Sequence, residues 1–176
     1  TFISTKIAMI NTLMETCHNL PNTNIDDISK AFALCDTRLI SDKYLYGGMG
    51  DGGGCHPRDN IALSYLAKKL NVSYNWYEGI MSQREKQTDW LADLIVSEKF
   101  EMDINILGKC FKPETNLTLG SPSLLLYNIL VEKGERVKIW DPYVDSMDLK
   151  NIVQQNEWET KPQLFFIGTK HEAFKH

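Results

Sequence analysis

The 176-residue sequence contains no apolar run that approaches the roughly 20 residues of a membrane-spanning helix, and no charged segment followed by an apolar one opens it. It also lacks long runs of one charge, because 23 acidic and 19 basic residues are interspersed, with a formal net charge of −4. This distribution argues against a polyanion-binding surface, and so against nucleic acid as a partner. We expect a cytoplasmic protein without membrane contact.

The cysteines lack the pairing that a metal site or a disulfide framework needs. Cys17, Cys35, Cys55 and Cys110 lie far apart, and no two of them form a C-x-x-C pair. This spacing argues against structural zinc and against a disulfide scaffold. We therefore predict free thiols and no bound metal.

The first half of the sequence has a helical pattern. The hydrophobic content of the chain, 43%, is ample for a packed core. An apolar stripe at helical spacing is formed by Ile3, Ile7, Ile10, Met14 and Cys17. It predicts a helix of about 17 residues, whose stripe either joins the core of the chain or forms a dimer seam. Asn24 is placed to cap a second helix through Ala33. A third helix begins near Asp59 and a fourth covers about residues 76–97.

The pattern changes period at Met102. A strand followed by a loop is predicted over Asp103–Gly108, and a helix over Pro122–Glu132. Two further strands are predicted over Arg136–Trp140 and Gln163–Gly168. Strands that alternate with helices favour a parallel sheet. We predict an α/β fold with a helical domain over residues 1–100 and a small Rossmann-like parallel α/β domain over residues 101–176.

The stretch Gly47 to Asp59, GGMGDGGGCHPRD, holds six glycines before Cys55. Glycine permits positive φ and close approach of a ligand, and Pro57 favours a helix that begins near Asp59. A helix N-terminus favours a thiolate, and a carboxylate one turn further on can handle protons or water. We predict that Cys55 is a catalytic nucleophile; an incidental buried cysteine beside a flexible glycine loop is the alternative.

This stretch resembles the signature of the UDP-glucose/GDP-mannose dehydrogenase family, G-x-G-x-G-G-x-C-x-x-K-D, in which Cys55 and Asp59 match the catalytic cysteine and aspartate. Four further segments resemble the family's D-x-R, G-x-A-F-K-P-x-T, S-P and V-x-x-Y-D-P elements, in the same order: Asp36–Arg38, Gly108–Thr115, Ser121–Pro122 and Val137–Pro142. Several motifs in one order are far more specific than any one of them.

The resemblance implies a helical central dimerisation domain followed by a domain that binds a UDP-sugar. Members of the family oxidise the primary alcohol of a nucleotide-linked hexose, commonly UDP-glucose, to a carboxylate with two NAD⁺. The resemblance implies that Cys55 forms a thiohemiacetal and then a thioester, and that Asp59 assists water or proton transfer. It implies substrate contacts from Arg38, Tyr44, Gly50, Gly52, Gly53, Phe111 and Lys112.

The chain departs from the family pattern at several positions. Leu119 stands where the family often has an arginine near the cofactor, and Arg58 replaces the lysine before the catalytic aspartate. Asp51 occupies a position that is often aromatic, and His56 one that is usually apolar. A Cys–His couple is a known nucleophile device, yet adjacent side chains rarely point at each other, so we do not assign His56 as the base.

Two elements of the family's active site are not found in this sequence. No strand–turn–helix setting for a dinucleotide-binding G-x-G-x-x-G occurs, so the main NAD⁺ site is expected on an N-terminal domain absent from this chain. Lys6 and Asn11 miss the family's catalytic K-x-x-x-N spacing by one residue. The leading interpretation is therefore one part of a nucleotide-sugar dehydrogenase. The alternatives are a non-catalytic binding or dimerisation module and a thiol hydrolase or acyltransferase built on Cys55.

The 176-residue chain alone is expected to show little or no dehydrogenase activity, because the elements that bind NAD⁺ are not found in it. The measurement is NADH formation from UDP-glucose, followed by absorbance. Robust turnover by this chain would contradict the expectation.

Overall fold

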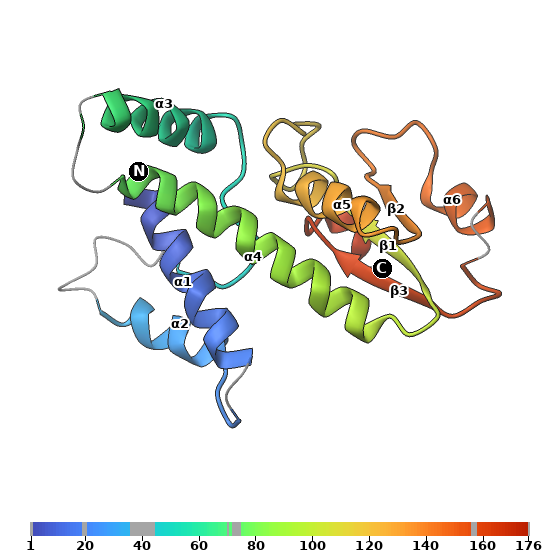
Figure 1. The fold of residues 1–176 in the computed structure, drawn as a ribbon. Coiled ribbons are helices and arrows are strands. Elements are labelled where there is room, and N and C mark those ends of the chain that lie inside the picture. The colour runs from blue at the N-terminus through green and yellow to red at the C-terminus, as the bar shows by residue number, and fades with distance from the viewer. Residues whose placement is uncertain are drawn as a thin grey trace. The chain divides into compact units, whose positions relative to one another are not determined.

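The structure is a computed structural model that describes residues 2–18, 21–35, 45–69, 71, 75–155 and 158–175 (Figure 1). The chain divides into two compact units. Unit 1 comprises Thr1–Asp51 and Cys55–Gln87, and unit 2 comprises Gly52–Gly54 and Thr88–His176. The division falls inside helix α4 (Trp76–Glu98), so the domain boundary expected near residue 100 stays a prediction.

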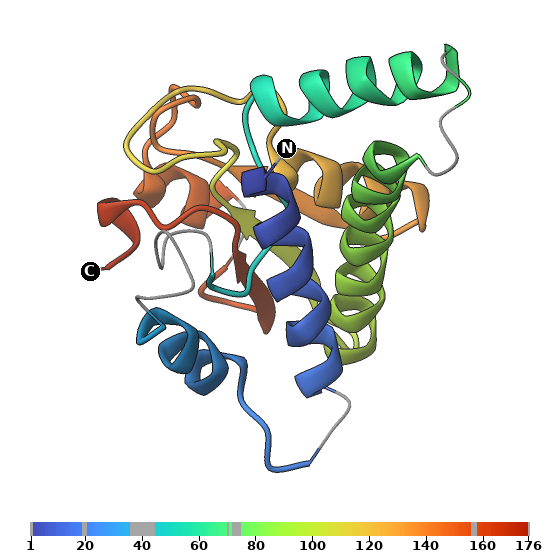
Figure 2. The ribbon, with the colours of Figure 1, turned by 90° about the vertical axis from the view of Figure 1, so that its left-hand side faces the viewer.

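Unit 1 is helical, as the sequence pattern predicts. Helix α1 (Phe2–His18) and helix α2 (Ile25–Ala33) lie side by side (Figure 2). The side chain of Asn24 caps α2 by accepting a hydrogen bond from the N–H of Asp26 at 2.8 Å, which confirms the predicted cap. Ile10, in the middle of the predicted apolar stripe, is fully buried within the chain. That residue therefore belongs to the intramolecular core, and the dimer remains a prediction.

Helix α3 (Cys55–Lys69) begins four residues earlier than the predicted start near Asp59. The reason is that a proline in the first turn of a helix removes no intrahelical hydrogen bond, so Pro57 does not delay the start. The helix is tied to α1 by a buried hydrogen bond from Asn60 Nδ2 to Ser4 Oγ at 3.2 Å. Cys55 is thus the first residue of a helix rather than a loop residue before one.

Unit 2 contains a three-stranded parallel sheet of β1 (Asp103–Leu107), β2 (Val137–Trp140) and β3 (Gln163–Ile167), in the order β2-β1-β3 (Figure 1). Helix α5 (Pro122–Glu132) connects β1 to β2, and its N-cap is Ser121. The predicted α/β fold is confirmed. Two short helices were not predicted, α6 (Leu149–Gln155) and the 3₁₀-helix η1 (Glu172–Phe174).

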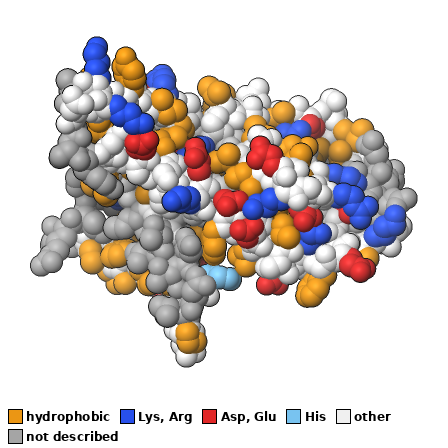
Figure 3. Space-filling model, viewed as in Figure 1, with side chains coloured by type: hydrophobic (Ala, Val, Ile, Leu, Met, Phe, Trp, Pro, Cys, Tyr) orange, Lys and Arg blue, Asp and Glu red, His pale blue; other side chains and the backbone are white. Residues whose placement is uncertain are grey.

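The core of unit 2 lies where α5 covers the sheet. Its fully buried apolar side chains are Ile104, Ile106, Leu126 and Leu130. Beyond the C-terminus of α5, Lys133 Nζ lies 2.8 Å from the carboxylates of both Asp89 and Asp93 on α4, which joins these two helices within unit 2. On the face in Figure 3, the described acidic and basic side chains are interspersed. Of the described helices, none has both the length and the apolarity needed to cross a membrane.

Replacement of Ile106 by alanine is expected to lower the free energy of unfolding by about 2–5 kcal/mol, because it leaves a cavity in the central strand. The matched control is Ile167→Ala on the edge strand β3, where half of the side chain is exposed. We expect a loss below about 1 kcal/mol there, since little apolar surface is uncovered. Urea denaturation of the two variants measures both values, and equal losses would contradict this account of the core.

Candidate functional site

The glycine-rich segment before Cys55 is held in unit 1 by side chains from two helices. Asn11 of α1 accepts a hydrogen bond from the N–H of Gly48 at 3.1 Å, and Gln87 of α4 donates one to the carbonyl oxygen of Gly48 at 3.2 Å. The guanidinium of Arg84, also on α4, donates to the carbonyl oxygen of Asp51 at 3.2 Å. The backbone of this segment is therefore fixed between α1 and α4 by polar contacts.

Two of the departures from the family pattern lie together in this segment. The carboxylate of Asp51 is 5% exposed; its Oδ1 lies 3.3 Å from Arg84 Nε and its Oδ2 lies 3.6 Å from His56 Nδ1. Asp51 Oδ2 and His56 Nδ1 have no hydrogen-bond partner among the described residues. A buried carboxylate needs a compensating charge, which Arg84 supplies. Polar contacts thus occupy one position that is often aromatic in the family, that of Asp51, and one that is usually apolar, that of His56.

The three glycines next to Cys55 belong to unit 2, where they pack against the segment that follows β1. A Cβ atom on Gly52 would lie 2.6 Å from Phe111 Cβ, and one on Gly53, whose φ is +86°, would lie 3.2 Å from Phe111 Cε2. Gly120, with φ +69°, has no room for a Cβ, which would lie 2.5 Å from the carbonyl oxygen of Gly53. Side chains at these places would separate the two segments, so the glycines permit a close backbone contact.

Cys55 and Asp59 lie one turn apart at the start of α3, and Cys55 is exposed. The carboxylate of Asp59, half exposed, lies 3.0 Å from Arg58 Nε. This hydrogen bond, together with the charge of Asp59, raises the pKa of Arg58. The predicted nucleophile and the predicted acid–base residue are therefore presented by one helix N-terminus, and their roles stay predictions.

The segment that follows the carboxyl end of β1 carries two further predicted site residues, Phe111 and Lys112. The connection from β1 leads to β2 on one side of β1, whereas β3 pairs with β1 on the other side. The order of the strands therefore reverses between β1 and β3, at their carboxyl ends. Ligands of open parallel sheets bind at such a switch point. Phe111, partly buried, and Lys112, exposed, follow β1 there. A Cβ atom on Gly108, whose φ is +102°, would lie 2.7 Å from the backbone N of Thr169 beyond β3, so glycine permits the close passage of these two segments.

Some predicted residues cannot be placed, and some structural partners were not predicted. Arg38 and Tyr44 lie outside the described residues. Asn11 was considered only for a spacing that it misses, and Arg84 and Gln87 were not singled out at all. Gln87 is 2% exposed on α4, so a polar residue on the inner face of a helix was the one sequence signal available.

Comparison with known proteins identifies the relatives of this chain. The central-domain model of the UDP-glucose/GDP-mannose dehydrogenase family matches residues 1–84. The UDP-glucose 6-dehydrogenase TuaD of Bacillus subtilis is 31% identical over 144 residues, covering 80% of this chain and 31% of that protein. The UDP-glucose 6-dehydrogenase of Rickettsia felis is 30% identical over 178 aligned positions, covering 99% of this chain and 38% of that protein.

Solved structures share the fold along almost the whole chain. A UDP-glucose dehydrogenase from Pyrobaculum islandicum superposes with a TM-score of 0.77 at 19% identity, covering 98% of this chain and 42% of that one. A UDP-D-ManNAc dehydrogenase from Pyrococcus horikoshii gives 0.78 at 23% identity, covering 99% and 40%. The helical unit and the small parallel sheet therefore share the fold of these two nucleotide-sugar dehydrogenases.

The chain belongs to the UDP-glucose/GDP-mannose dehydrogenase family. It spans between 31% and 38% of the length of the two curated relatives described above.

Substitution of Gly53 by alanine is expected to cost about 1–2 kcal/mol of unfolding free energy, because a residue with a Cβ is disfavoured at positive φ and would press on Phe111. Gly48→Ala is the matched control, since a Cβ there has no atom within 4 Å. We expect a change below about 0.5 kcal/mol for the control. Thermal denaturation of both variants tests the difference, and the interpretation fails if Gly53→Ala is as stable as Gly48→Ala.

Proposed function

We propose that this chain forms part of the active site of an NAD-dependent dehydrogenase that oxidises a UDP-hexose, with UDP-glucose as the first candidate, to the uronic acid. The observation that carries the proposal is the packing of Gly52 and Gly53, just before Cys55 in the chain, against Phe111. The relatives named UDP-glucose 6-dehydrogenase support this substrate class.

In this proposal the segment after β1 binds the nucleotide. Phe111 offers a ring face for the uracil base, and the exposed ammonium of Lys112 offers a positive charge to the sugar diphosphate. Gly50, Gly52 and Gly53 are proposed to contact the substrate through their backbone N–H and carbonyl groups, because the space beside their Cα atoms is filled by Arg84 and Phe111. Arg38 and Tyr44, outside the described residues, are proposed to complete the contacts with the sugar nucleotide.

Cys55 is proposed to keep the intermediate covalently bound. Removal of the first hydride and of the hydroxyl proton converts the primary alcohol to an aldehyde. The Cys55 thiolate adds to the aldehyde carbon, and the carbonyl oxygen takes a proton to form a thiohemiacetal. Loss of a second hydride and of that proton forms a thioester, which water cleaves to release the carboxylate and the thiol. Asp59, one turn along α3, is the residue placed to accept a proton from the water.

The hydride acceptor in this proposal is NAD⁺. The turn after β1 does not fit a dinucleotide diphosphate, because its N–H groups are used within the chain: those of Lys109 and Cys110 donate to Asp141, and those of Phe111 and Glu114 donate to Leu117 and His171. No residue of this chain is therefore assigned to the cofactor.

A homodimer through the helical unit belongs to the same proposal. It is supported by helix α3, which exposes three large apolar side chains: Ile61, Tyr65 and Leu66. Exposed apolar side chains on one element are typical of an interaction surface.

Alkylation of Cys55 tests the proposed site on the chain itself. We expect UDP-glucose at ten times its dissociation constant to slow the reaction of Cys55 with iodoacetamide about tenfold, because only the free site reacts. Cys35 is an internal control, since it is also exposed but lies outside the proposed site. Peptide mapping by mass spectrometry reports both rates. Equal rates with and without UDP-glucose at Cys55 would refute the proposal.

A further inference from the structure

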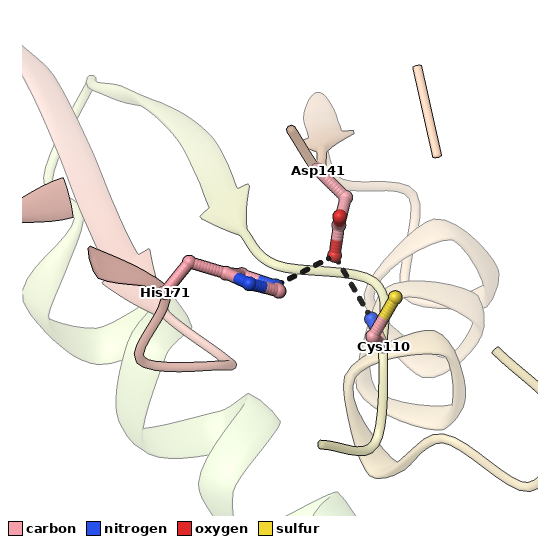
Figure 4. A group of neighbouring side chains, drawn as sticks. All are labelled: Cys110, Asp141 and His171. Carbon is pink, nitrogen blue, oxygen red and sulfur yellow. Dashed lines mark hydrogen bonds and ion pairs between the residues drawn. The ribbon is translucent and has the colours of Figure 1, made fainter. Parts of the chain in front are cut away.

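The carboxyl edge of the sheet holds a cluster of three buried side chains, one from the segment after each strand (Figure 4). Cys110 follows β1, Asp141 follows β2 and His171 follows β3, and none of the three is more than 1% exposed. All three residues belong to unit 2. Figure 4 shows the carboxylate of Asp141 between the other two residues, so Asp141 is the centre of the cluster.

The carboxylate of Asp141 is surrounded by donors. Its Oδ2 accepts hydrogen bonds from the N–H groups of Lys109 at 2.7 Å and Cys110 at 3.1 Å, and lies 3.1 Å from His171 Nε2. Its Oδ1 accepts from the N–H of Tyr143 at 2.8 Å. Burial opposes ionisation, but these donors outweigh it and lower the pKa of Asp141. A buried carboxylate is therefore kept ionised by backbone and side-chain donors from three segments.

The thiol of Cys110 remains protonated in this environment. Burial, and then the hydrogen bond to Asp141, raise its pKa to about 12. Such a thiol is a weak nucleophile and a poor metal ligand, because both roles need the thiolate. Cys110 therefore acts in the cluster as a hydrogen-bond donor.

The tautomer of His171 is determined by its two neighbours. Its Nδ1 accepts a hydrogen bond from the N–H of Glu114 at 3.1 Å, so the ring proton of the neutral imidazole lies on Nε2, which faces Asp141. The ligand atoms of Cys110, Asp141 and His171 lie within 4.8 Å of one another, a spacing at which a metal ion is conceivable. An ion would have to displace the protons on both the thiol and Nε2, so the contacts favour a hydrogen-bonded cluster.

These bonds fix the segment after β1 on both sides of Phe111 and Lys112. Before this dipeptide, the N–H of Cys110 is held by Asp141, and the hydroxyl of Thr169 donates to the carbonyl oxygen of Cys110. After it, the N–H of Glu114 is held by His171. The Glu114 carboxylate accepts one hydrogen bond from the hydroxyl of Tyr143 and another, at 2.8 Å, from the N–H of Glu172. These two hydrogen bonds, first the one from Tyr143 and then the one from Glu172, lower the pKa of Glu114.

We propose that Asp141 and His171 are positioning residues that set the conformation of the Phe111–Lys112 segment for binding a sugar nucleotide. Neither residue touches the ligand; both act through the backbone that carries Phe111 and Lys112. The inference rests on the proposed function for its ligand, while the contacts that support it lie entirely within unit 2.

A double-mutant cycle on the 176-residue chain tests this inference. Asp141→Asn is expected to weaken UDP-glucose binding about tenfold in the unsubstituted chain and less than about twofold in a Lys112→Ala background, because Asp141 acts through Lys112. Isothermal titration calorimetry measures the four affinities, and thermal denaturation shows that each variant is folded. His171→Ala serves in the same cycle if Asp141→Asn does not fold.

Cys110→Ala is the matched control. It removes one donor of Asp141 and installs the alanine of the family pattern, so we expect affinity within about twofold of the unsubstituted chain. Equal losses from Asp141→Asn in both backgrounds would overturn the positioning role, because a general structural effect is additive. Unchanged affinity in Asp141→Asn would overturn it as well.

Amide hydrogen exchange without ligand separates this inference from the proposed function. Asp141→Asn is expected to accelerate exchange at Cys110 and Glu114 about tenfold or more, with no change in Cys110→Ala. Unchanged exchange overturns the inference even if UDP-glucose binds. Failure of the unsubstituted chain to bind UDP-glucose, with exchange accelerated as expected, refutes the sugar-nucleotide site and leaves the structural coupling intact. If added Zn²⁺ raises the melting temperature of the unsubstituted chain but not that of Cys110→Ala, the cluster is a metal site, and the interpretation as a hydrogen-bonded cluster is wrong.

Discussion

A carboxylate that leaves water has to be compensated, and this constraint organises the carboxyl edge of the sheet. Asp141 is fully buried, and its charge is balanced by donors from the segments after all three strands. Losing such donors would leave a desolvated charge, which costs far more than one neutral hydrogen bond contributes. The three segments are therefore held in one arrangement by a single side chain, and the residues proposed to bind the sugar nucleotide lie on one of them.

The same constraint recurs in unit 1. Asp51 is also buried, and Arg84 of α4 compensates its charge while holding its carbonyl oxygen. In both units a buried acid thus fixes the backbone of a segment that the family resemblance connects to catalysis or to substrate binding. The acid in unit 1 stands at a position that is often aromatic in the family, so here ionic contacts replace apolar packing.

The glycines before Cys55 have a second effect, because the lack of a side chain lets two backbone segments pass close to each other. Gly52 and Gly53 allow the backbone before Cys55 to contact the side chain of Phe111. Gly120, which also lacks a side chain, allows the carbonyl group of Gly53 to lie close to its own backbone. A segment built in this way has few side chains of its own with which to hold its shape. Its conformation depends on neighbours, which explains why polar contacts from α1 and α4 surround its first part.

Local rules predicted much of the fold. Periodicity located α1, α4, α5 and the three strands, and the capping residue Asn24 marked the start of α2. The start of α3 was placed four residues late because Pro57 was taken to precede the helix. The short α6 and η1 were missed, since so few residues carry little periodic signal.

Patterns along the chain were enough to predict the class of secondary structure and the parallel α/β character, and the series of motifs pointed to the family. The candidate roles of Cys55, Asp59, Phe111 and Lys112 are implied by the resemblance to that family. The surroundings of the candidates came from the fold alone: the partners of Asp51, and the joining of Cys110, Asp141 and His171 across 30 and 31 residues of chain. The physical reason is that burial and charge compensation are set by strand order and helix packing, which bring together residues that no local pattern relates.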